Sequence, residues 1–245
     1  MIKYFKFDPI PEGINQSSRG GNKIEWLVIH DTANFNKGAG AYSHKRFFSS
    51  PRRSSAHVFI DDTVALQIIG DSKSAWHCGD NQGKGRYLNG CRNNNSMGFE
   101  LCVNPDSNYE EAYKGLVELI KNYMYYLKIK PERVCRHYDV SRKRCPGTFF
   151  DKGLWNNFQQ DIRKEREYDI DIRKPYAVPI KIKKEKEKEV TTMEKQNVSS
   201  WAKEAWVWAV KNKITDGERP KAPATREEVI AFIYRLYEVM KNEGK

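Results

Sequence analysis

An imidazole and a thiol stand eight residues apart in the segment HYDVSRKRCPG, which runs from His137 past Cys145. A second imidazole, His30, ends the apolar run WLVIH far upstream. Two histidines and one cysteine can form an open tetrahedral zinc site, whose fourth position stays free for water or substrate. Water bound to such an ion has a pKa near ~7, so hydroxide is available at neutral pH. The three residues therefore indicate hydrolytic metal chemistry, with a purely structural role for each histidine as the alternative.

These residues must be positioned by a folded sheet. Residues 25–30 are apolar on both faces until the chain turns polar at His30, as in a buried strand that emerges at a sheet edge. Three further segments predict strands, the first two as a hairpin: 56–60, 64–69 and 97–103. The last of them carries one charged residue, Glu100, among apolar neighbours. Apolar residues at helical spacing over 112–127 and 154–162 predict helices between and after the strands, which indicates the α/β class.

Composition limits the classes of protein. The chain has 245 residues, enough for one substantial core and a smaller second domain. We expect no membrane-spanning segment, and the lysine-broken N-terminus predicts a chain made in the cytosol without a signal peptide. An odd number of cysteines argues against a disulfide framework: Cys78, Cys91, Cys102, Cys135 and Cys145. The net charge of +11 suits a polyanion, either nucleic acid or an acidic wall polymer, or serves only solubility.

The pattern changes after the first domain, which we place at residues 1–165. Residues 166–195 are rich in lysine and glutamate, and we interpret them as a charged linker. Residues 196–245 predict a small all-α module, in which Thr225 and Glu228 form a capping box at the start of the second helix. About 50 residues make a poor independent core, so this module is expected to need a partner or self-association.

Five motifs in order over residues 20–160 resemble the type 2 N-acetylmuramoyl-L-alanine amidases of the peptidoglycan-recognition-protein fold. They are WLVIHD (26–31), SAHVFID (55–61), AWHCG (75–79), NSMGFE (95–100) and the run 137–147. The resemblance implies a central mixed β-sheet flanked by helices. It also implies a phage endolysin or autolysin that cuts the amide between N-acetylmuramic acid and L-alanine in peptidoglycan, acting on the cell wall. The implied zinc ligands are His30, His137 and Cys145.

Other site residues follow from the same resemblance. Glu100 matches the catalytic carboxylate of one branch of the family, and burial would raise its pKa into a range that suits a proton shuttle. Lys143 matches a family lysine that could stabilise the oxyanion. A glutamate satisfied by a backbone or lysine partner, and a solvated surface charge, are the structural alternatives. His77 is assigned to substrate binding or to packing, and His57 to a supporting role. The other branch has a tyrosine where this chain has Ala56, which favours Glu100 as the base.

The C-terminal module resembles a single S-layer-homology repeat. By analogy Trp201, Asp216 and Arg226 would bind secondary cell wall polysaccharide, whereas helix core is the alternative role for its tryptophans. Only one copy is visible, so either self-association would complete the groove or the module would only pack on the catalytic domain.

Three other functions compete with a zinc amidase. A peptidoglycan-binding protein without activity would have lost the cysteine ligand, which is present here. A peptidase with Cys145 as nucleophile and His137 as base would work without metal. A nucleic-acid binder would need a recognisable motif, which the sequence lacks, so we expect neither nucleic acid nor membrane as partner.

Overall fold

The computed structural model describes residues 2–79, 87–88, 90–182, 198–212, 214–215 and 221–243. The chain divides into two compact units, residues 1–182 and 183–245. None of the helices in the described residues is long and apolar enough to cross a membrane.

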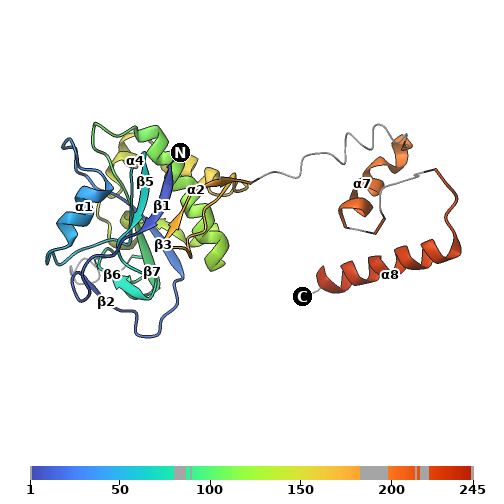
Figure 1. Ribbon diagram of the computed structural model, residues 1–245, viewed down its shortest axis with the longest axis horizontal. Helices are drawn as coiled ribbons and strands as arrows, with labels where there is room; N and C mark the ends of the chain where they lie inside the picture. Colours follow the sequence, from blue (N-terminus) through green and yellow to red (C-terminus); the bar gives the residue numbers. More distant parts are fainter. Residues whose placement is uncertain are drawn as a thin grey trace. The chain divides into compact units, whose positions relative to one another are not determined.

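A seven-stranded mixed sheet forms the centre of the first unit (Figure 1). Its strand order is β10-β1-β5-β4-β7-β3-β8. β3 is parallel to both β7 and β8, whereas β4 and β5 form the predicted antiparallel hairpin. The bounds are β1 Tyr4–Phe7, β3 Trp26–Asp31, β4 Val58–Ile60, β5 Val64–Gln67, β7 Ser96–Leu101, β8 Val134–Arg136 and β10 Tyr176–Ala177. Two small sheets pair β2 (Gln16–Ser18) with β6 (Lys73–Ala75), and β9 (Tyr168–Asp169) with β11 (Ile180–Lys181).

Helices cover both faces of this sheet. α2 (Tyr109–Leu127) begins after Asn108, whose side chain accepts a hydrogen bond from the backbone of Glu111, and it packs on one face. α1 (Ala41–Phe48) packs on the other through Ala41, against Phe59 and Leu66. The remaining helices of this unit are η1 Asn93–Asn95, η2 Pro131–Arg133, α3 His137–Ser141, α4 Gly147–Asp151 and α5 Trp155–Asp161. A mixed sheet flanked by helices confirms the α/β class predicted for the first domain.

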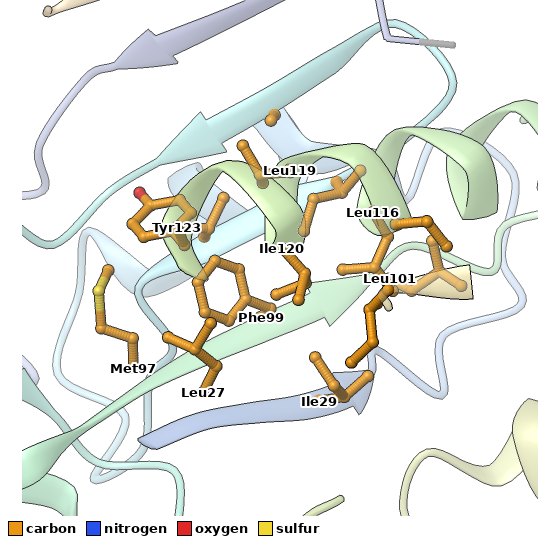
Figure 2. Close-up of a cluster of buried hydrophobic side chains, with 14 of the residues drawn as sticks. Leu27, Ile29, Met97, Phe99, Leu101, Leu116, Leu119, Ile120 and Tyr123 are labelled. Atoms are coloured by element: carbon orange, nitrogen blue, oxygen red, sulfur yellow. The ribbon is translucent and has the colours of Figure 1, made fainter. Parts of the chain in front are cut away.

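Alternation along β3 and β7 separates the core from the candidate site. Figure 2 shows the side chains that point toward α2: Leu27, Ile29, Met97, Phe99 and Leu101. They pack against Leu116, Ile120 and Tyr123 of that helix. Because successive side chains of a strand point to opposite faces, His30, Gly98 and Glu100 lie on the other face.

The structure differs from the predicted linker in residues 166–182, which belong to the first unit. Ile170 and Ile172 are buried in its core, and β10 extends the main sheet beside β1. Buried Asn122 of α2 bonds the backbone of Tyr168 and Ile170. The high charge of the segment suggested disorder, but its spaced apolar residues contribute enough burial to order it. Residues 183–195 lie outside the described residues.

The described part of the second unit contains η3 (Ser200–Ala202), α7 (Lys203–Lys211) and α8 (Arg226–Glu243). The predicted capping box is present, since the Thr225 amide donates to Glu228 Oε2 at 2.8 Å and the Glu228 amide to Thr225 Oγ1 at 3.1 Å. One face of α8 exposes large apolar side chains, which we call the α8 stripe: Ile230, Ile233, Tyr234, Tyr237 and Met240. Two helices of this length are too few to cover such a face.

Candidate metal centre

Three neighbouring parallel strands, β7, β3 and β8, bring the candidate residues to one edge of the sheet. His30 is the penultimate residue of β3 and is in register with Glu100 on β7. β8 lies on the other side of β3, and His137 follows it directly. Carboxyl ends of parallel strands share an edge, so residues distant in sequence meet there.

His30, His137 and Cys145 form a compact buried cluster. One potential ligand atom from each lies within 4.8 Å of the others. The Sγ of Cys145 is 3.7 Å from Nδ1 of His30, and the two imidazole rings have centroids 4.7 Å apart. The three side chains that the sequence analysis grouped are thus brought together by the fold.

The cluster fits a divalent ion better than it fits a hydrogen-bonded network. Neither ring nitrogen of His137, which is 5% exposed, has a hydrogen-bond partner among the described residues. Burial and the charge of Lys143 lower its pKa to about 4, and burial also lowers the pKa of His30. Both rings are therefore neutral, as metal ligands must be. Burial raises the pKa of the Cys145 thiol, so without a cation this group keeps its proton.

Glu100 lies against this cluster with one oxygen unused. Its Oε1 is 3.9 Å from Nδ1 of His30, and Oε2 is buried with no hydrogen-bond partner among the described residues. Burial first, and then the nearby Asp31, raise its pKa to about 8 against the charge of Lys143. A carboxyl held in this range can both accept and release a proton near neutral pH.

Lys143 is the exposed cation beside the cluster. Its charge contributes to the pKa values of Glu100, His137 and Cys145. Arg144, next to it, instead forms an ion pair with Asp151 on the surface. Among the described residues Lys143 makes no ion pair, which leaves its ammonium available.

Asp31 is a residue that the sequence analysis did not select, although it ends the quoted motif WLVIHD. Its Oδ2 accepts hydrogen bonds from both the backbone N–H and the Oγ1 hydroxyl of Thr148, each at 2.7 Å. This anchor fixes the start of α4 beside β3, three residues after Cys145. A carboxylate adjacent to a strand-end histidine could have signalled it.

His77 and His57 lie behind the cluster. His77 is 5% exposed, and both of its ring nitrogens have polar neighbours in the protein: His30 on one side and Ser96 on the other. This placement is consistent with the packing alternative, and substrate binding by His77 stays a prediction. His57 is fully buried and accepts a hydrogen bond from the Gly98 amide at Nδ1, in a supporting position as expected.

The residues proposed for wall binding are described in part. Trp201 is 88% exposed, and Arg226 is exposed at the start of α8. Asp216 lies outside the described residues. All three residues belong to the second unit, residues 183–245.

Comparison with known proteins assigns the first unit. A family model described as N-acetylmuramoyl-L-alanine amidase matches residues 20–148, which is more than half of the chain. The chain belongs to this family. All the candidate ligands fall within the matched residues, and so do Glu100 and Lys143.

Individual relatives agree with the family. The amidase CwlH of Bacillus subtilis is 34% identical over 160 residues, covering 64% of this chain and 60% of CwlH. The amidase XlyA of Bacillus subtilis is 31% identical over 156 residues, covering 63% of this chain and 50% of XlyA. The chain thus spans about half to 60% of the length of these relatives.

Solved structures match the same part. The catalytic domain of XlyA superposes with a TM-score of 0.57 at 31% identity, over 64% of this chain and 98% of that domain. A mutant endolysin from Bacillus subtilis gives 0.58 at 31% identity, over 66% of this chain and 99% of its own. These matches support the amidase fold for the first unit.

Proposed function

We propose that this chain is a zinc-dependent N-acetylmuramoyl-L-alanine amidase that hydrolyses the amide between N-acetylmuramic acid and L-alanine and so lyses bacterial cell wall. The observation that carries the proposal is the buried cluster of His30, His137 and Cys145, with ligand atoms within 4.8 Å of one another and Glu100 beside it. Membership of the amidase family indicates which bond the protein hydrolyses.

The residues divide the reaction between them. A zinc ion held by the three ligands would supply Lewis acidity and lower the pKa of bound water to near ~7. Glu100 accepts the proton of the attacking water and transfers it to the leaving nitrogen of L-alanine. Lys143, exposed at the rim, places positive charge where the carbonyl oxygen of the lactyl group becomes negative.

The thiol-peptidase alternative fits the structure less well. A nucleophilic cysteine has a lowered pKa and is accessible. Cys145 is 5% exposed, and burial raises the pKa of its thiol. Its neighbours favour a role as ligand.

The second unit is proposed to bind secondary cell wall polysaccharide and to self-associate. An indole that is 88% exposed, as in Trp201, is suited to stacking on a sugar ring. Full-length protein and its Trp201→Ala variant should differ in co-sedimentation with purified walls but not in hydrolysis of a small muramoyl peptide. Equal co-sedimentation would contradict this role.

Product analysis tests the bond that is cut. Purified peptidoglycan is digested, and soluble products are examined by mass spectrometry and by end-group labelling. We expect intact glycan strands together with new amino termini of L-alanine. New reducing sugar ends would instead show a glycosidase, and new amino termini on other residues would show an endopeptidase.

A further inference from the structure

A buried chain of hydrogen-bonding groups runs away from the metal centre behind His30. Nε2 of His30 lies 3.1 Å from Nδ1 of His77. Nε2 of His77 lies 3.2 Å from Oγ of Ser96, whose hydroxyl donates to the backbone carbonyl of Arg92 at 2.5 Å. The side chains of all three residues are at least nine-tenths buried.

The last bond in this chain fixes the hydroxyl proton of Ser96 and guides the assignment of the two ring protons. A carbonyl oxygen can only accept, so the one hydroxyl proton of Ser96 is directed at Arg92. Ser96 Oγ can then accept from Nε2 of His77, at 3.2 Å, and from the thiol of Cys78, whose Sγ is 3.4 Å away; this arrangement places a His77 proton on Nε2. Nδ1 of His77 is then left as an acceptor, and it accepts a hydrogen bond from the Nε2–H group of His30. These positions are assigned from the hydrogen-bond network.

This arrangement leaves the lone pair of His30 on Nδ1. The same atom is 3.7 Å from Cys145 Sγ and 3.9 Å from Glu100 Oε1, so the lone pair is directed into the metal centre. The opposite tautomer would place a proton there. It would also leave Nε2 of His77 in need of a donor, which Ser96 could supply only by giving up its bond to Arg92 and which Cys78 could supply only from 3.9 Å.

His77 is held in place by the strand behind it and by a side-chain amide. A Cβ on residue 98 would lie 2.7 Å from Cγ of His77, so the ring occupies space that only Gly98 leaves open. The backbone amides of His77 and Cys78 both donate to Oδ1 of Asn93, at 2.9 and 2.8 Å. The acceptor for His30 therefore has little freedom to move.

We propose that His77 and Ser96 are positioning residues that fix the tautomer and ring orientation of His30, so that Nδ1 is its ligand atom for zinc. This inference rests on the proposed zinc centre, and it replaces the substrate-binding role that the sequence suggested for His77. A partner on the second ring nitrogen orients a ligating histidine and increases its basicity, and losing such a partner typically weakens metal binding by about 10- to 100-fold.

Zinc affinity tests the inference without reference to activity. The dissociation constant of zinc is measured by competition with a chromophoric chelator for the full chain and four variants: His77→Ala, His77→Asn, Ser96→Ala and His44→Ala. His77→Ala should raise the constant by about 10- to 100-fold. His77→Asn should lose less, because its amide oxygen can accept from His30, and Ser96→Ala should fall between the full chain and His77→Ala.

His44→Ala is the matched control. His44 is also a buried histidine, but it stacks on Phe59 on the α1 face of the sheet, with ring centroids 5.1 Å apart. It does not belong to the hydrogen-bonded chain of His30, His77 and Ser96. Its zinc affinity should equal that of the parent. Far-UV circular dichroism checks that each variant is folded; if His77→Ala is not, His77→Asn and Ser96→Ala carry the test.

The outcomes separate this inference from the proposed function. If the folded His77 variants and Ser96→Ala bind zinc as tightly as the control, the positioning role is overturned. If KM rises in the His77 variants while their zinc affinity is unchanged, His77 is a substrate-binding residue instead. A parent chain that binds no zinc would overturn the metal centre itself. In cobalt-substituted protein, altered d–d bands in His77→Ala with a retained thiolate charge-transfer band would support a disturbed His30 ligand.

Discussion

The catalytic role proposed for Glu100 conflicts with stability. Its side chain is 18% exposed, and one of its oxygens is buried without a hydrogen-bond partner among the described residues. Burial of a carboxyl without full pairing disfavours the charged form. The same environment that suits a proton shuttle therefore destabilises the folded chain when the group ionises.

Glu100→Gln should stabilise the metal-free protein at alkaline pH. The folded-state pKa of about 8 lies above the usual value of 4.5, so the contribution of Glu100 to stability is complete below pH 4.5 and is lost as pH rises toward 8. Each pKa unit corresponds to about 1.4 kcal/mol. We therefore expect the free energy of unfolding of the variant to exceed that of the parent by a few kcal/mol at pH 8 and by little at pH 4. Urea unfolding of chelator-treated protein at both pH values measures this.

The activity of Glu100→Gln should fall, although its stability rises. Loss of a general acid–base group should lower kcat by about 10²- to 10⁴-fold. A variant that is less stable than the parent at pH 8, or that keeps full activity, would contradict the role given to Glu100.

Lys143 is compared with its neighbour Arg144. Removing one oxyanion-stabilising group typically lowers kcat by about 10²- to 10³-fold, so Lys143→Ala should lose activity in this range with zinc still bound. Arg144→Ala removes a charge of the same sign whose partner is Asp151, and it should stay within about 2-fold of the parent. Steady-state kinetics and zinc content are measured for both; equal losses in the two variants would indicate a general effect of loop charge.

At this scale the sequence predicted residue types better than it predicted contacts. His30, His137 and Cys145 could be grouped because few side chains bind zinc and because the motifs are specific. The roles of Ser96, Asp31 and His77 depend on which atom faces which neighbour across three strands. That information exists only after β3, β7 and β8 are in register.

The elements were predicted where their patterns are local. The buried strands around His30 and Glu100 and the hairpin appear as short apolar runs that end at polar residues, and the helix over residues 112–127 has clear helical spacing. Short edge strands such as β10 do not, since two residues carry no alternation. The segment 166–182 was assigned to the linker because its charge outweighed its scattered apolar residues.

Truncation tests the boundary at residue 182. A chain ending at residue 182 should unfold in urea at the same midpoint as the first unit of the full chain. A chain ending at residue 165 exposes core positions otherwise covered by Ile170 and Ile172, and it removes the amides of Glu167 and Tyr168 that donate to buried Glu118. Burying one isoleucine contributes about 1.5–3 kcal/mol, so the free energy of unfolding of the chain ending at residue 165 should be lower by at least about 3 kcal/mol. Equal midpoints for the two truncations would show that the segment is dispensable.

For the whole molecule, the α8 stripe suggests association of chains. An apolar helix face of this kind is expected to be covered in solution, and a 50-residue module lacks the core to cover it by itself. We expect full-length protein to sediment as an oligomer whose mass depends on concentration. Ile233→Glu should shift it to monomer, whereas Lys241→Glu, on an already polar exposed position of the same helix, should not. A monomeric parent at all concentrations would contradict self-association.

The central claim is that zinc held by His30, His137 and Cys145 is required for amide hydrolysis. The most direct measurement follows the release of L-alanine amino termini from peptidoglycan alongside zinc content, before chelation, after chelation and after zinc is restored. We predict a single zinc ion per chain, loss of activity in proportion to zinc removed, and recovery on its return, with Cys145→Ser failing to recover. Full hydrolysis by zinc-free protein, or by Cys145→Ser without bound metal, would contradict the account.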